Sequence, residues 1–136
     1  MRLVSVLLGA ACTLTACEAT SPQPRVFDGL RIYSRSRFAT AEECVAAQAS
    51  GPAHCTQEAS FCPDGRATIR LTETLLAAQY DVRGDTITLG LAVNQETPPE
   101  MFFTLTSDGS AITALATNHM WSRDEPMEAS LAGVCN

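Results

Sequence analysis

The chain has 136 residues, of which 46% are hydrophobic and 18% are charged, a composition that describes one ordinary globular domain and excludes a disordered chain or a coiled coil. Its formal net charge is −6, and all nine of its basic side chains are arginines. Because such an acidic chain repels phosphate backbones and anionic lipid headgroups, no nucleic-acid partner is expected.

The first sixteen residues are typical of an export signal. Met1 and Arg2 make a short positive start, and an apolar run of twelve residues extends from Leu3 to Leu14. A membrane-spanning helix needs roughly twenty apolar residues, so this run fits the hydrophobic region of a signal peptide. We therefore expect residues 1–16 to be a signal that is removed.

The residues that follow, Leu14-Thr15-Ala16-Cys17, resemble a bacterial lipobox, with an apolar residue, two small residues and a cysteine. The resemblance implies that the Cys17 thiol receives a diacylglycerol and that the chain is cleaved before it. Two or three acyl chains hold a protein stably on a membrane, whereas one binds marginally. In this class an aspartate after the cysteine commonly signals inner-membrane retention, and Glu18 stands there instead, which favours the periplasmic face of the outer membrane. Ordinary signal cleavage is the alternative.

Residues 17–29 are expected to form the lipid anchor and a flexible tether, because the stretch 18–26 is polar, contains prolines and has no hydrophobic period. Extended at about 3.1 Å per residue, this stretch would hold the domain on the order of 25 Å from the membrane. Half of the eight arginines left after cleavage lie near the tether, at positions 25, 31, 35 and 37, and we interpret them as solvated. Residues 30–136 then form a single domain.

Four cysteines remain in this domain: Cys44, Cys55, Cys62 and Cys135. An even number in an exported chain predicts two disulfides, for which three connectivities exist. We favour Cys44 with Cys55, joining a helix to the loop after it, and Cys62 with Cys135, joining the C-terminus to the first strand of the sheet. A metal site formed by the first three cysteines and His54 is the alternative, but the paired C-x-x-C spacing of zinc sites is absent. No metal or other cofactor is expected.

The domain begins with a short alternating stretch at 30–38 that is compatible with a strand, and a helix near 41–49 follows. Thr40 and Glu43 form a capping box in which the hydroxyl accepts the Glu43 amide and the carboxylate reaches back to the Thr40 amide. Gly51 and the proline after it end the helix.

Beyond the helix the hydrophobic period changes to two, which is typical of half-buried strands, and turn sequences separate the segments. Strands are predicted near 57–62, 66–71, 74–82, 86–93, 101–106 and 111–123, the last one broken at Thr117-Asn118. The expected fold class is mainly β: an antiparallel meander of about six strands that forms a twisted sheet or a small, partly closed barrel, with one N-terminal helix.

No group of residues in the sequence amounts to a catalytic site. The G-x-S-x-G, H-x-H and H-E-x-x-H patterns are absent. His54 and His119 are the two candidate bases, and both fall in predicted turns, where a solvated histidine is the simpler interpretation. We therefore expect no catalytic residues and no enzyme activity.

The possible partner-binding residues are Trp121 and the acidic cluster that follows it, Asp124, Glu125 and Glu128. The acids form either a solvated rim or a site for a cationic partner. The indole, like the Tyr80 ring, also fits a position in the core or at the end of a barrel.

Several segments between residues 61 and 135 are similar in outline to the membrane-bound inhibitors of C-type lysozyme. These segments are Phe61-Cys62-Pro63-Asp64-Gly65, Trp121-Ser122-Arg123, Glu128-Ala129-Ser130-Leu131 and the closing Cys135. The resemblance implies a small lipoprotein β-barrel in which the early and terminal cysteines pair. The Ser-Gly loop ending in tyrosine, which enters the lysozyme cleft in that family, is not reproduced, since Ser107-Asp108-Gly109 is followed by Ser110-Ala111-Ile112. The meander also resembles other lipocalin-like envelope lipoproteins.

The sequence thus predicts a non-enzymatic envelope lipoprotein that binds an unknown protein or a small apolar ligand, with inhibition of C-type lysozyme as the alternative. Three structural features distinguish these possibilities. An inhibitor should have exposed acids on a loop, a small-molecule binder an apolar barrel mouth, and an enzyme a histidine beside a carboxylate or hydroxyl.

Overall fold

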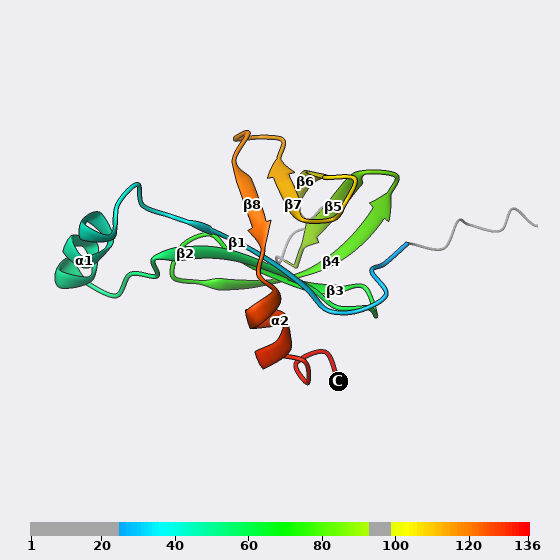
Figure 1. Ribbon diagram of the computed structural model, residues 1–136, viewed down its shortest axis with the longest axis horizontal. Coiled ribbons are helices and arrows are strands. Elements are labelled where there is room, and N and C mark those ends of the chain that lie inside the picture. Colours follow the sequence, from blue (N-terminus) through cyan, green and yellow to red (C-terminus); the bar gives the residue numbers. More distant parts are fainter. Residues whose placement is uncertain (1–24, 93–98) are drawn as a thin grey trace, which may run out of the picture.

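The computed structural model describes residues 25–92 and 99–136 and shows eight antiparallel strands that close into a barrel, with two short helices (Figure 1). The strands are β1 (Arg31–Ser36), β2 (Thr56–Phe61), β3 (Arg66–Arg70), β4 (Leu75–Arg83), β5 (Thr86–Leu91), β6 (Glu100–Leu105), β7 (Ala111–Ala114) and β8 (Met120–Arg123). The helices are α1 (Ala41–Ser50) and α2 (Glu125–Ser130). The proposed lipid site Cys17, the signal and most of the tether lie outside the described residues.

Each strand pairs with its neighbours in the chain, and the pairing of β1 with β8, Tyr33 opposite Arg123, closes the barrel. The mainly β meander is therefore confirmed. The expected count of about six strands is lower than the eight observed. The stretch at 30–38 supplies β1, and the segment 111–123 forms two strands, β7 and β8, rather than one. The chain reverses between β7 and β8 at Asn118, whose φ of 56° lies in the left-handed region that asparagine tolerates.

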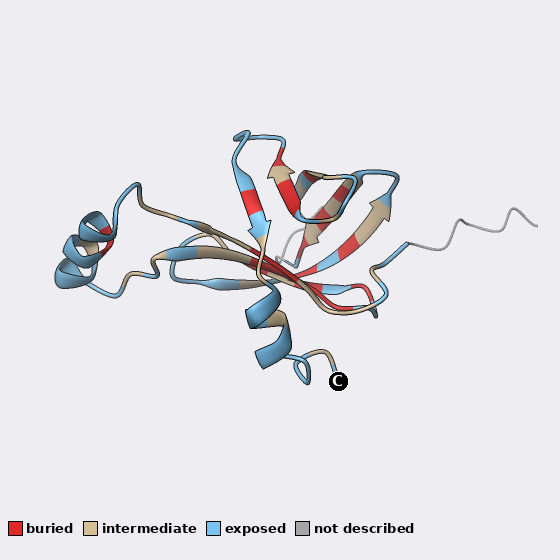
Figure 2. Cartoon of the chain, viewed as in Figure 1, coloured by how far each residue is buried: buried red, intermediate tan, exposed pale blue. Residues whose placement is uncertain are grey.

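The barrel interior is filled by alternating side chains, a pattern visible as buried positions along the strands in Figure 2. The largest buried side chains include Trp121, Tyr33, Phe61 and Phe103, each 2% exposed or less. Because burial of one large apolar side chain contributes about 1.5–3 kcal/mol, these residues are a principal source of the domain's stability.

Aromatic side chains close the end of the barrel at which β1 begins, which we call the closed end. The Phe27 ring stacks on Tyr80 with centroids 5.6 Å apart and meets Phe61 edge-on at 5.7 Å. The Tyr80 hydroxyl donates to the Cys62 carbonyl at 2.8 Å and accepts the Phe27 amide at 2.9 Å. Burial raises the pKa of this hydroxyl, so the closed end is held by an uncharged network.

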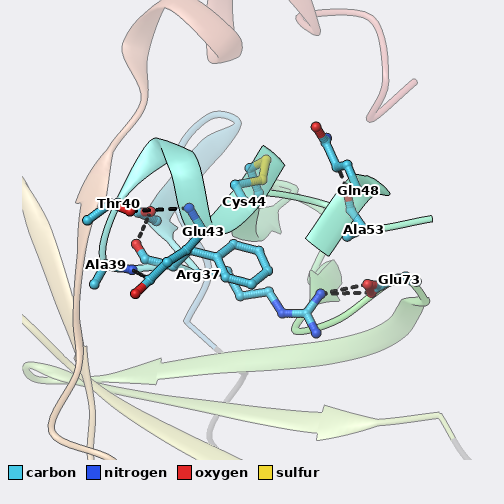
Figure 3. Close-up of a disulfide and its surroundings, with 11 residues drawn as sticks. Arg37, Ala39, Thr40, Glu43, Cys44, Gln48, Ala53 and Glu73 are labelled. Carbon is cyan, nitrogen blue, oxygen red and sulfur yellow. Dashed lines mark hydrogen bonds and ion pairs between the residues drawn. A yellow bond between two sulfur atoms is a disulfide. The ribbon is translucent and has the colours of Figure 1, made fainter. Parts of the chain in front are cut away.

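Helix α1 stands away from the barrel on the connection between β1 and β2 (Figure 1). Its capping box is present with one difference, because the Glu43 carboxylate accepts the Ala39 amide at 2.9 Å rather than that of Thr40, whose hydroxyl accepts the Glu43 amide at 3.2 Å. Figure 3 shows the surroundings of α1, where Arg37, just after β1, donates to both oxygens of the Glu73 carboxylate, at 2.7 and 2.8 Å.

Both favoured disulfides are confirmed. The Cys44–Cys55 bond joins α1 to the segment that enters β2, and the Cys62–Cys135 bond fixes the C-terminal tail to the closed end. No helix in the described part of the chain is long and apolar enough to cross a membrane.

Candidate functional site

The acidic cluster is placed at the closed end, where most of it serves the local structure. Asp124 caps α2 by accepting the Met127 amide at 3.1 Å, and it also accepts the Ser34 hydroxyl at 3.2 Å. Glu128 forms a two-pronged ion pair with Arg123, at 2.9 and 2.8 Å. Only Glu125, whose side chain is 73% exposed, is left to meet a partner.

Trp121 is separated from these acids, because its side chain points into the barrel. It is 2% exposed and packs edge-on against Phe103, with centroids 5.8 Å apart. Its indole N–H is buried and has no acceptor among the described residues. The four residues predicted as a partner site therefore do not share one surface.

The indole instead lines an open cavity of about 410 Å³ at the end of the barrel opposite the closed end. This open end is where β1 ends and β8 begins. Apolar walls come from Leu71, Met101, Phe102 and Leu115, the last two of which are 42% and 58% exposed. The cavity is thus an apolar mouth above a filled core.

Polar side chains enter the same cavity from β1, β2 and the start of β8. Arg35 and Gln57 are paired in register, and each lies two positions from a buried core residue, Tyr33 and Ala59 respectively. Alternation along a strand therefore turns both side chains toward the barrel axis, at the level where the core ends. His119, at the rim, completes the group.

These polar groups contact one another. An Arg35 Nη donates to Gln57 Oε1 at 3.4 Å and contacts His119 Nδ1, which must accept because a guanidinium only donates. The Gln57 amide nitrogen donates to the Leu71 carbonyl at 3.0 Å. Arg35 is thus held in place by neutral groups.

Of the two arginines that line the cavity at the open end, one has a carboxylate partner and the other does not. Arg37 is neutralised by Glu73, whereas Arg35 forms no ion pair with any carboxylate of the described residues. Glu100 is an exposed acid on the cavity lining. The Arg35 guanidinium is therefore a cation without a counter-ion beside the apolar walls of the cavity.

Other hollows lie outside the barrel. A groove of about 430 Å³ runs between the outer face of β2 to β4 and the C-terminal residues Leu131 and Val134. A shallower hollow of about 300 Å³ at the closed end is lined by Asp108, Arg123 and Glu125. Hydrogen bonds from the amide of Ser110, the hydroxyl of Thr106 and the hydroxyl of Ser110 lower the pKa of the Asp108 carboxyl to about 2, so it is ionised at neutral pH.

The histidines form no catalytic arrangement in the described part of the protein. His54 is exposed in the loop before β2, and the ring of His119 contacts Arg35 rather than a carboxylate or a hydroxyl. Residues 25–92 and 99–136 contain no group of three or more His, Cys, Asp or Glu side chains placed to hold a metal ion.

Sequence reasoning identified Trp121 but not its cavity partners. Arg35 was grouped with three other arginines as solvated, and Gln57, Leu71 and Met101 were assigned only to strands. The available signal was the spacing of two between Tyr33 and Arg35. In a strand, this spacing places the Arg35 side chain on the same face as the core residue Tyr33.

Comparison with protein-family models, with curated proteins and with solved structures finds no match to this chain.

Proposed function

We propose that this protein is a lipid-anchored envelope protein that binds a small, partly apolar ligand in the cavity at the open end, without catalysing a reaction. The observation that carries the proposal is the cavity itself. Its apolar walls and the convergent side chains of Arg35, Gln57 and His119 meet at one end of a filled barrel, above the buried ring of Trp121.

The size and construction of the cavity support ligand binding. A volume of about 410 Å³ falls within the roughly 300–1,000 Å³ typical of small-molecule sites, which combine apolar walls with a few placed polar groups. Several of its residues extend directly from paired strands, so the site is rigid and largely preformed. A preformed site loses little conformational entropy when it binds.

The arrangement of the two barrel ends supports the anchoring part of the proposal. The N-terminal segment enters at the closed end, where the Arg25 carbonyl accepts the Val82 amide at 2.8 Å and the Arg25 amide donates to Asp81 at 3.0 Å. A lipid on Cys17 would therefore hold the closed end toward the membrane. The cavity at the opposite end would open to the aqueous space.

Trp121 is the only tryptophan of the chain and lines the cavity, so its fluorescence tests ligand binding directly. The mature chain 18–136, which retains every described residue, is titrated with anilinonaphthalene sulfonate, an apolar dye. We expect saturable dye emission with quenching of Trp121 by energy transfer.

Two variants of matched exposure locate the dye. Leu115→Ser removes an apolar wall of the cavity from a residue that is 58% exposed, and Val134→Ser does the same in the outer groove at 56% exposure. We expect severalfold weaker binding for the first variant and no change for the second. Loss of dye binding only in the Val134→Ser variant, or no quenching of Trp121 at saturation, would refute the proposal.

Inhibition of C-type lysozyme is the second candidate, and the hollow at the closed end favours it. Asp108, in the loop between β6 and β7, and Glu125, at the start of α2, are exposed acids that line this hollow together with Arg123. Such acids suit a basic partner. The barrel and the Cys62–Cys135 bond also match what the resemblance implies.

A further inference from the structure

We infer that the ligand of the open-end cavity is an aliphatic monocarboxylate, whose carboxylate is bound by the Arg35 guanidinium. The inference rests on the proposed function and names its ligand class. It follows from what the cavity side chains can donate and accept.

The floor of the cavity supplies the first step. Trp121 lines the cavity, but its side chain is 2% exposed and its indole N–H is buried below the surface that an occupant would meet. The ring therefore offers an apolar contact, and a polar group of the ligand must be bound by the side chains at the rim.

Arg35 supplies the second step. Its contacts in the cavity are with the side chains of Gln57 and His119, neither of which is a carboxylate, and they leave its positive charge without a counter-ion among the described residues. Arg37, two positions along the chain, is by contrast paired with Glu73. The planar fork of a guanidinium matches the two oxygens of a carboxylate.

The number of charges favours a single carboxylate over a phosphate. One cation without a counter-ion faces the cavity, and the carboxylate of Glu100 also lies on its lining. A dianionic phosphate would exceed the available positive charge and would be repelled by Glu100. The walls of Leu71, Met101 and Leu115 then accept an aliphatic body, which is why the ligand class is amphiphilic.

Calorimetric titration of the mature chain 18–136 with three eight-carbon probes tests the inference. Octanoate carries the carboxylate, 1-octanol has the same chain without charge, and octyl phosphate carries a larger charge. We expect octanoate to bind at least about tenfold more tightly than octanol, because hydrogen bonds to charged groups are the stronger class. Octyl phosphate should bind more weakly than octanoate.

Variants assign the carboxylate to its donor. Arg35→Met should weaken octanoate binding about tenfold or more and leave octanol unchanged. Arg83→Met is the charge-matched control, because Arg83 lies at the closed end with its side chain 75% exposed, and it should have no effect. If Arg35→Met does not fold, Arg35→Lys replaces it in the titration. This variant keeps the charge but lacks the planar fork, and it should bind octanoate more weakly than the wild type.

The outcomes separate this inference from the proposed function. Equal affinities for octanoate and octanol, or tighter binding of octyl phosphate, overturn the carboxylate assignment and leave the ligand-binding cavity standing. An effect of Arg83→Met equal to that of Arg35→Met overturns the assignment to Arg35. Absence of binding by all three probes and by the dye overturns both.

Discussion

Glu128, like the N-cap Asp124, joins α2 to the barrel. Its carboxylate accepts two hydrogen bonds from Arg123, and one of its oxygens also accepts the Ile32 amide of β1 at 3.0 Å. Burial alone would raise the pKa of this carboxyl, but the hydrogen bonds from Arg123 and Ile32 outweigh burial, so the pKa lies below its ordinary value. The interaction is therefore strongest when Glu128 is charged.

Glu128→Gln should lower the free energy of unfolding at pH 7 by about 1–3 kcal/mol, the usual range for a buried, charge-assisted hydrogen bond. Because the pKa is lowered in the folded state, the stabilisation is fully present above the unfolded value of about 4.3 and is lost as the pH falls through the folded value. Urea unfolding of both proteins at neutral pH and near pH 3 measures this difference.

The difference between wild type and Glu128→Gln should shrink toward the lower pH. Glu125→Gln is the control, since Glu125 lies 3.6 Å from Arg123 with a side chain that is 73% exposed, and we expect a change of at most about 0.5 kcal/mol. A gap that stays constant with pH would contradict the assignment of the lowered pKa to the folded ion pair.

Single residues of the site were partly predictable. Two disulfides followed from the even number of cysteines, their pairing was a preference among three connectivities that the structure confirms, and Trp121 was selected together with the acids that follow it. The cavity partner Arg35 was not selected, because its role depends on the register that places it opposite Gln57 and near His119. Such register is a property of strand pairing rather than of local sequence.

At the scale of elements, local patterns located most of the strands and the first helix. The predicted helix at 41–49 is α1, and the period of two marked β2 to β6 within a few residues of their ends. Full closure of the barrel was left undecided between a twisted sheet and a partly closed barrel, because it depends on pairing between β1 and β8 at opposite ends of the domain sequence. No local periodicity carries that information.

Helix α2 was missed, and its length explains why. It has six residues and none of them is buried, so it presents no apolar stripe to detect. The usable signal was Asp124 as the N-cap, with Pro126 in the first turn, a combination that favours a helix start. In the sequence these acids were interpreted as either a solvated rim or a site for a cationic partner, whereas in the structure two of them hold the C-terminal segment.

The two ends of the barrel differ, and this difference determines how the domain would be oriented by a lipid anchor. The N-terminal segment, α2 and the Cys62–Cys135 bond all lie toward the closed end, and the cavity lies at the other. With a tether on the order of 25 Å long, a lipid on Cys17 would leave the cavity facing away from its own membrane.

Cys17→Ala should leave the precursor unprocessed or release the protein from the membrane, because the acyl chains have no other thiol at the lipobox. Detergent-phase partitioning of wild type and variant, with gel mobility to detect the uncleaved signal, measures the change. A variant of wild-type size that still partitions with the membrane would show that lipid on Cys17 is not the anchor.

The last prediction concerns lysozyme, against which we expect the mature chain to act weakly or not at all. Cleavage before Cys17 leaves eight arginines against fifteen acids, a net charge of −7, which attracts a basic lysozyme and speeds encounter. Exposed rim charges such as Glu125 nevertheless add little lasting affinity. Tight inhibition needs a desolvated anchor in the enzyme cleft.

The closed end offers no such anchor. The loop between β6 and β7 carries Asp108 but no aromatic residue, and Ile112, near the position where the inhibitor family ends its loop in tyrosine, is fully buried in the barrel. Any residual inhibition should fade between low and physiological salt, where the Debye length shrinks to about 8 Å. Titration of lysozyme activity at two salt concentrations measures this, and salt-resistant inhibition at submicromolar protein would make lysozyme, rather than a small ligand, the partner of this barrel.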